Sequence, residues 1–184
     1  MNPQLMNGND YRLLLALFQT YSSLEKEIQK RTNQISNHFC HRCLSRCCKE
    51  EICRESVESV FLSVLVGKQD IEYDCQNGWM SPSGCRLNYG RPLVCYEFFC
   101  EEIVKSGDFQ LSNIKKIIKE FISVGKRAHG NTHLICIDNL ETMSKIKIAR
   151  INYKMKELMN KLTVHSMQLE RTNSSIEHSG LTEC

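Results

Sequence analysis

The stretch SNIKKIIKEFISV, residues 112–124, has the clearest helical pattern in the chain. Its apolar side chains recur at steps of three and four residues, which places them on one face of a helix. These apolar residues are Ile114, Ile117, Ile118, Phe121 and Ile122. Lysines and a glutamate occupy the other face. The hydroxyl of Ser112 can cap the first turn, so we expect an amphipathic helix over residues 113–124.

Three other stretches repeat this period. The pattern predicts a long helix over residues 10–37 and a second over residues 55–66, with Gly67 as a left-handed C-terminal cap. Pro92 suits the first turn of a third helix, which we expect to end before Gly107.

The C-terminal part of the chain predicts one more helix and a tail. Asp138 and Glu141 resemble a capping box, and the apolar spacing continues over residues 139–162. After Thr163 the chain is polar and has little to bury, so we expect a mobile tail.

Turn-forming residues are concentrated between residues 68 and 91, where they predict a loop or at most a short hairpin. No alternation elsewhere demands a sheet. The expected fold class is therefore mostly α: a small single helical domain with irregular cysteine-rich loops around a metal site. We expect an N-terminal helix over residues 1–37, a cysteine-cluster region over 38–107 and C-terminal helices over 108–163, together forming one domain, and a flexible tail over 164–184.

Composition indicates a globular protein of 184 residues, with 41% hydrophobic and 24% charged residues. The apolar runs are too short to span a bilayer, and the N-terminus lacks the features of a signal peptide. Cys184 is the last residue, not the fourth from the end, so it does not form a prenylation signal. We therefore expect a cytoplasmic protein without a membrane partner.

The formal net charge of +3 is too small to indicate nucleic acid, so no nucleic-acid partner is expected. The basic stretches 115–119 and 145–156 could bind an acidic protein partner. Such stretches are more often solvated helix faces.

Eleven cysteines are the most informative feature of the composition. Cytosolic thiols are kept reduced, and clustered cysteines in that compartment are more often metal ligands than disulfides. A first group, in FCHRCLSRCC at residues 39–48, contains Cys40, Cys43, Cys47 and Cys48, and Cys53 follows closely. Such short spacing allows several thiolates to converge on one ion or cluster. A second group contains Cys85, Cys95 and Cys100.

Other residues near these groups are weaker candidates. Cys75, Cys136 and Cys184 have no partner at ligand spacing, so we expect them not to bind metal. His38 and His41 flank Cys40, but a histidine beside a metal site more often orients a ligand or faces solvent. Nearby basic residues would lower the pKa of the thiols. They are Arg42, Arg46, Lys49 and Arg54.

The cysteine pattern resembles the YkgJ-type cysteine-cluster family, described as zinc- or iron-chelating. The resemblance covers residues 39–100: the first cysteine group, then Gly84 with Cys85, and the stretch from Arg91 and Pro92 to Cys100. Three residues precede the cysteine pair here, where the family's signature has two. The resemblance implies a metal site of eight thiols and kinship with flagellin lysine N-methylases. These thiols are Cys40, Cys43, Cys47, Cys48, Cys53, Cys85, Cys95 and Cys100.

Three functions remain open at the level of sequence. The first is a non-enzymatic protein that holds an iron-sulfur cluster or Zn²⁺, with Arg91 and Pro92 shaping the loop between the two groups. Four cysteines suit tetrahedral zinc or a [4Fe-4S] cluster equally, and eight could hold two centres. The all-thiolate set, together with the kinship to methylases that are similar to iron-sulfur proteins, slightly favours the cluster. The second is an S-adenosylmethionine-dependent protein lysine N-methyltransferase, which kinship alone suggests, since no strand precedes a glycine-rich turn and a helix. The third is a redox-sensing or interaction module.

Overall fold

The computed structural model describes residues 8–40, 49–81, 84–106 and 109–179, with the side chains left undescribed beyond Thr163. Two long helices dominate it, α1 (Gly8–Cys40) and α8 (Ile148–Ser179). Between them lie α2 (Glu50–Glu58), α3 (Val60–Val66), α4 (Val94–Glu97), α5 (Glu101–Lys105), α6 (Phe109–Val124), the 3₁₀ helix η2 (Leu134–Cys136) and α7 (Leu140–Ser144). The mostly helical, single-domain fold class is confirmed.

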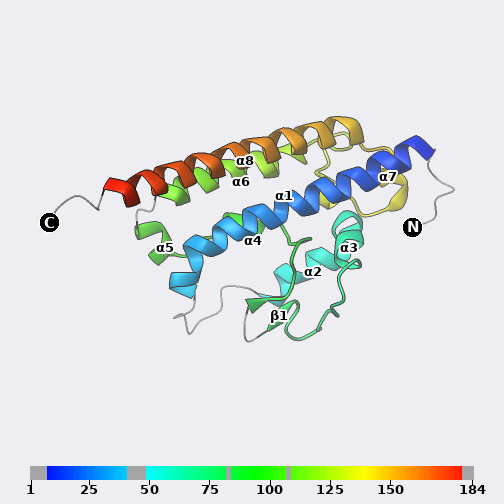
Figure 1. The fold of residues 1–184 in the computed structure, drawn as a ribbon. Helices are drawn as coiled ribbons and strands as arrows, with labels where there is room; N and C mark the ends of the chain where they lie inside the picture. The colour runs from blue at the N-terminus through cyan, green and yellow to red at the C-terminus, as the bar shows by residue number, and fades with distance from the viewer. Residues whose placement is uncertain (1–7, 41–48, 82–83, 107–108, 180–184) are drawn as a thin grey trace.

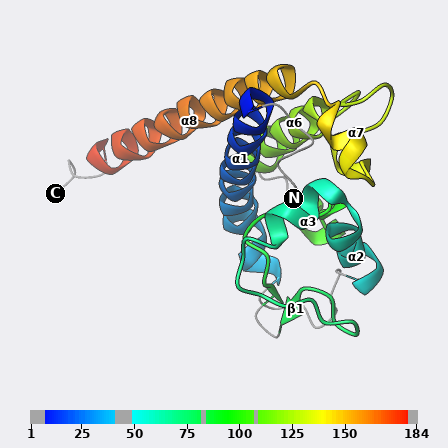
Figure 2. The same ribbon diagram turned by 90° about the vertical axis from the view of Figure 1, so that its right-hand side faces the viewer.

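The apolar face of α1 forms the centre of the core. Its buried side chains follow the predicted helical period. They are Leu14, Leu17, Phe18, Tyr21, Leu24 and Ile28. Helices α6 and α8 pack on α1 and on each other along one side. Helices α2 and α3 and the β-hairpin lie on the opposite side (Figures 1 and 2). Of the described cysteine-rich region, α2 and the hairpin thus lie in one layer, whereas α4 contacts α6 in the other.

Aromatic side chains join the two layers through α1. Phe18 stacks on Phe61 of α3 with ring centroids 4.9 Å apart, and Tyr21 meets the same ring edge-on. Tyr21 also contacts Phe121 of α6. Phe121 in turn lies 5.9 Å from the ring of Tyr96 in α4. Each aromatic pair of this kind stabilises the folded state by about 1 kcal/mol beyond the contribution of its buried surface.

Residues 68–91, for which the sequence predicts a loop or at most a short hairpin, contain a short hairpin. Strand β1 (Met80–Ser81) pairs antiparallel with β2 (Gly84–Cys85), and Met80 lies opposite Cys85. The ladder is short because the flanking residues are turn formers.

The predicted helix over residues 55–66 is two helices instead. Helix α2 begins earlier, at Glu50, and ends at Ser59, whose backbone is extended. The Ser59 hydroxyl accepts the N–H of Leu62 at 3.2 Å and caps α3, which explains the break. The predicted left-handed cap at Gly67 is wrong, since its φ is −63°.

The predicted helix after Pro92 is also divided. Helices α4 and α5 are separated by extended backbone at Phe98 and Cys100. The bend allows the side chains of Tyr96 and Ile103, one from each helix, to enter the core.

The C-terminal boundaries differ from those predicted. Helix α6 begins at Phe109, so Ser112 lies inside it and does not cap it. Asn139, rather than Asp138, caps α7 by accepting the N–H of Thr142 at 2.7 Å. Residues 145–147 then separate α7 from α8. The backbone after Thr163 continues as helix α8, and the mobility of this segment stays a prediction. Among the residues that the structure describes, no helix is both long and apolar enough to cross a membrane.

Candidate metal centre

The structure places four of the eight predicted thiol ligands. Cys53 is buried in α2, and Cys85 is half-buried in β2. Cys95 is exposed in α4, and Cys100 is half-buried just before α5. The other four ligands lie outside the described residues or, for Cys40, have no described side chain. Their convergence on one site stays a prediction.

Cys53 receives a hydrogen bond from the main-chain N–H of Trp79. The peptide can approach this closely because residue 78 is glycine, with φ of +59°. A Cβ atom at Gly78 would lie 2.6 Å from the Cβ of Cys53 and 2.9 Å from its Sγ, closer than real contacts allow. A peptide N–H aimed at sulfur stabilises the thiolate, the form that binds metal.

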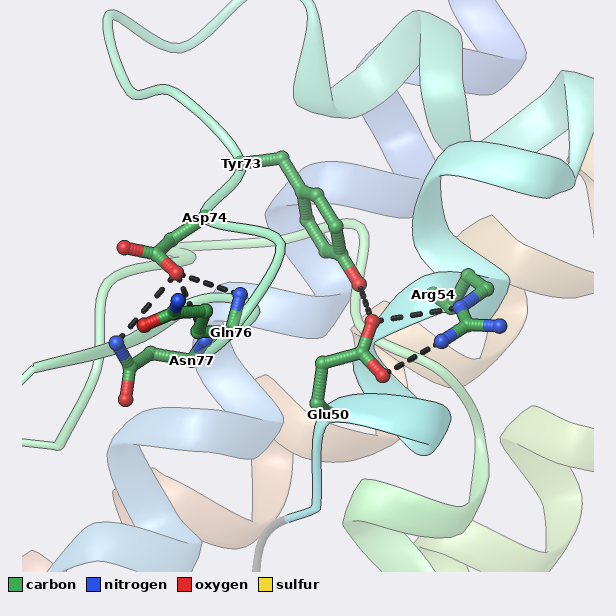
Figure 3. Close-up of polar contacts among 6 residues, drawn as sticks. All are labelled: Glu50, Arg54, Tyr73, Asp74, Gln76 and Asn77. Atoms are coloured by element: carbon green, nitrogen blue, oxygen red, sulfur yellow. Dashed lines mark hydrogen bonds and ion pairs between the residues drawn. The ribbon is translucent and has the colours of Figure 1, made fainter.

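The turn that presents this N–H is built by Asp74. Its carboxylate accepts the N–H groups of Gln76 at 2.7 Å and Asn77 at 2.8 Å (Figure 3). Main-chain hydrogen bonds in both directions between Asp74 and Gly78 close the turn. The sequence predicts a turn here from Asn77 and Gly78, but not its contact with α2.

Glu50 fastens the same loop to the start of α2. Its carboxylate pairs with the Arg54 guanidinium at 2.7 Å and accepts the hydroxyl of Tyr73, as Figure 3 shows. The ring of Tyr73 packs edge-on against Trp79, with centroids 5.0 Å apart. Cys53 lies on α2 between the two paired residues, so these contacts hold Trp79 against it.

The prediction that nearby basic residues lower thiol pKa values does not hold for Cys53. Its pKa is raised, chiefly because burial disfavours the charged form, and the hydrogen bond from Trp79 offsets only part of this. Arg54 is engaged by Glu50 and is not among the groups that shift this pKa. The positive charge that acts on Cys53 is that of Arg91, far along the chain.

Arg91 is the residue whose positive charge acts on three of the described thiols. Its guanidinium donates to the carbonyl oxygen of Leu87, through Nε at 3.2 Å and a terminal nitrogen at 2.8 Å. Burial alone would lower the pKa of Arg91, but the charges of neighbouring groups raise it overall, and Cys85 and Cys95 are among them. Cys53, Cys85 and Cys95, from α2, β2 and α4, therefore all interact with one guanidinium.

A buried carboxylate positions the main chain at Arg91. Glu25 of α1 is fully buried and accepts the N–H groups of Gly90 at 2.6 Å and Arg91 at 2.7 Å. It also accepts the hydroxyl of Tyr96, to which Gln29 donates at 3.0 Å. Burial raises the pKa of Glu25 to about 7, although the hydrogen bonds that it accepts oppose this rise.

The sequence analysis missed Glu25. The signal available was its place on the apolar face of α1, four residues after Tyr21 and three before Ile28. A carboxylate on a buried helix face requires partners, because an unpaired charge in the core is costly.

The described thiols do not complete a site by themselves. In the chain as described, apart from residues 41–48 and the other gaps, no three cysteine, histidine or acidic side chains are grouped closely enough to hold an ion. The donor chemistry nevertheless fits a soft metal centre, since the thiols share a peptide N–H donor and a guanidinium that offset negative charge. That thiols of the first cysteine group complete the ligand set stays a prediction.

Other cysteines, and the histidines and basic side chains near the cysteine groups, are not predicted to bind metal. Cys75 and Cys136 are exposed, and Cys136 lies in η2, which contacts α3. Lys49 is exposed just before α2. The predictions for Cys184, His41, Arg42 and Arg46, and for the side chain of His38, fall outside the described residues.

Comparisons with protein-family models, with curated proteins and with solved structures find no match to this chain. The resemblance to the YkgJ-type family stays a prediction from the cysteine motifs.

Proposed function

We propose that this protein binds a metal through its two cysteine groups and that the metal connects the loops between α1 and α5. One observation carries the proposal: Cys53 of α2 and Cys85 of β2 pack in one small cluster with Trp79 and Leu87. The charge of the half-buried Arg91 acts on both of these thiols and on Cys95 of α4.

The complete ligand set combines these three thiols with Cys100 and the first cysteine group. An all-thiolate set suits a [4Fe-4S] cluster first and Zn²⁺ second. An iron-sulfur cluster would supply electron transfer, whereas zinc would supply a structural cross-link. Arg91 offsets part of the negative charge that such a set gathers, and the N–H of Trp79 does the same at Cys53.

The protonation of Cys53 makes metal binding pH-dependent. Burial raises the pKa of this thiol, and the thiol must lose its proton to act as a ligand. Affinity for metal is therefore expected to rise with pH.

The contacts of Arg91 favour a structural role over a reactive one. Its guanidinium is held by the Leu87 carbonyl, and its main-chain N–H by Glu25. Both ends of the residue are fixed, so Arg91 shapes the loop between Cys85 and Cys95. This arrangement supports a non-enzymatic metal protein.

The test is metal analysis of the full chain, purified without oxygen, together with its optical spectrum. We expect bound iron with broad absorption near about 400 nm, which is typical of thiolate-ligated clusters. Stoichiometric zinc in a colourless protein would keep the site and reject the cluster. Protein that folds fully without any bound metal would overturn the proposal.

Cys85→Ser and Cys75→Ser form a matched pair for this measurement. Both residues lie in the segment between α3 and α4, but only Cys85 interacts with Arg91. We expect Cys85→Ser to lower the metal content per chain, because a hydroxyl replaces a thiolate poorly on a soft centre. Cys75→Ser should leave the metal content unchanged.

A further inference from the structure

The small net charge hides a strong separation of charge between the two layers of the fold. Residues 49–106 carry six lysines and arginines against ten acidic residues, whereas residues 109–163 carry eleven against four. The first segment contains α2 to α5 and the hairpin, and the second contains α6, α7 and the start of α8. Of the second segment, α6 and α8 lie on the other side of α1 from α2, α3 and the hairpin (Figure 1), whereas α7 contacts α3. The molecule is therefore acidic around the cysteine loops and basic over α6 and α8.

Most of the basic side chains in this second layer have no acidic partner. Glu120 pairs with Lys161 at 2.8 Å, and Glu141 pairs with Lys145 at 2.5 Å. Eight other exposed cations make no ion pair with any residue that the structure describes. They lie on α6, on the turn after it and between residues 147 and 156, and we call them together the cationic face: Lys115, Lys116, Lys119, Lys126, Arg127, Lys147, Lys154 and Lys156.

One end of the cationic face is held rigidly. The Arg150 guanidinium donates to the carbonyl oxygens of Lys126 at 3.0 Å and Arg127 at 3.1 Å, which fastens the turn after α6 to the start of α8. The N–H of Lys147 donates to the carbonyl of Ala128 at 3.0 Å. Three cationic segments are thereby fixed next to the N-terminus of α8, where the helix dipole adds positive potential.

A groove opens beside this end. It has a volume of about 440 Å³ and is lined by Asp10, Leu13 and residues 144–150. Lys147 is common to the groove and the cationic face.

We propose that the cationic face binds the phosphodiester backbone of nucleic acid. Lysine and arginine are the side chains that contact such a backbone most often. The inference rests on the charge distribution and is independent of the metal proposal.

The composition of the face distinguishes nucleic acid from the other polyanions. An anionic membrane surface requires a helix with a broad apolar face beside its cations. Here the exposed large hydrophobic side chain described on α8 is Tyr153, which is 70% exposed and flanked by Asn152 and Lys154. An acidic protein partner would be expected to meet an apolar interface centre, and lysine is depleted in such interfaces. A single exposed aromatic ring among lysines suits base stacking.

The test is fluorescence anisotropy of labelled single-stranded and duplex DNA with the full metal-loaded chain over a series of salt concentrations. We expect the logarithm of the association constant to fall linearly with the logarithm of the salt concentration. The slope should be about −0.7 to −0.9 for each phosphate contacted. The triple variant Lys126→Gln, Arg127→Gln, Lys147→Gln should weaken binding at least tenfold and reduce the slope by about two to three, one contact per cation.

A matched control removes the same charge elsewhere. The control is a second triple variant, Lys30→Gln with Lys68→Gln and Lys105→Gln. These three lysines lie outside the cationic face, so the variant should leave the salt slope unchanged. Arginine at positions 126 and 147 should retain binding, which separates loss of charge from loss of folding. Equal losses in the two triple variants would overturn the proposal, as would no binding to DNA at low salt. Binding to phosphatidylserine-containing vesicles without binding to DNA would also overturn it.

Discussion

Glu25 accepts the main-chain N–H of Arg91 at 2.7 Å, so a buried carboxylate on the first helix sets the position of the residue whose charge acts on Cys53, Cys85 and Cys95. The two residues are 66 positions apart in the chain. The link is made through the backbone of Arg91, which leaves its guanidinium to donate to the Leu87 carbonyl. The core of the helical domain and the cysteine loops are therefore one connected structure.

The raised pKa of Glu25 predicts a pH-dependent stability. Its pKa of about 7 in the folded state exceeds the ordinary value of 4.5, so the folded state binds the proton more tightly than the unfolded state. This contribution to stability is complete below pH 4.5 and is lost as the pH rises through 7, by up to about 3 kcal/mol. Urea unfolding at pH 5 and pH 8 should show the loss in the wild type and little of it in Glu25→Gln.

Glu27→Gln is the control for this measurement, because Glu27 pairs with Arg31 at the edge of α1 and does not contact the Arg91 loop. It should keep the wild-type pH dependence. If Glu25→Gln keeps it as well, the carboxylate does not titrate as we predict.

Gly78→Ala should damage the thiol site beyond its effect on the backbone. The new methyl group would lie 2.6 Å from the Cβ of Cys53, and φ of +59° alone costs an alanine about 1–2 kcal/mol. Gly130→Ala is a matched control, since its φ is +55° and nothing lies within 4 Å of its Cβ position. We expect both variants to lose stability in chemical unfolding, Gly78→Ala more than Gly130→Ala, and only Gly78→Ala to lose bound metal. Equal metal content in the two variants would argue against Cys53 as a ligand.

Trp79 should report on the metal centre by its fluorescence. It is the only tryptophan of the chain, is 2% exposed and packs in a small cluster with Cys53 and Cys85. Removal of the metal with a chelator should loosen this cluster and shift the emission of Trp79 to longer wavelength, because water gains access to the ring. An emission spectrum that stays the same while metal analysis shows complete removal would place the metal away from Cys53.

The sequence predicts the long elements of this fold well because their burial follows a regular period. The face of α1 and the apolar positions of α6 are buried as expected. The failures occur where a single polar group decides a boundary. Ser59 breaks one predicted helix by capping the next, and Asn139 caps α7 in place of Asp138. Periodicity averages over several residues, so it does not detect such individual contacts.

The candidate site was only partly predictable for a related reason. Cysteine spacing along the chain identified Cys53, Cys85 and Cys95 without showing what surrounds them. Glu25 and Trp79 reach the site from other segments through contacts distant in sequence. Such contacts depend on tertiary packing, which a single sequence does not display.

Two buried tyrosines should respond in opposite ways to the loss of the hydroxyl. Both contact Phe121 and both are 2% exposed, so their packing environments are similar. The hydroxyl of Tyr21 has no hydrogen-bond partner among the described residues, whereas that of Tyr96 donates to Glu25 and accepts from Gln29. A buried unsatisfied hydroxyl costs free energy, and a satisfied one leaves its partners unpaired when it is removed. Tyr21→Phe is therefore expected to be neutral or stabilising. Tyr96→Phe should lower the free energy of unfolding by about 1–3 kcal/mol. Urea unfolding of the two variants at one pH measures the difference, and a loss in Tyr21→Phe as large as that in Tyr96→Phe would show that Tyr21 has a partner in solution.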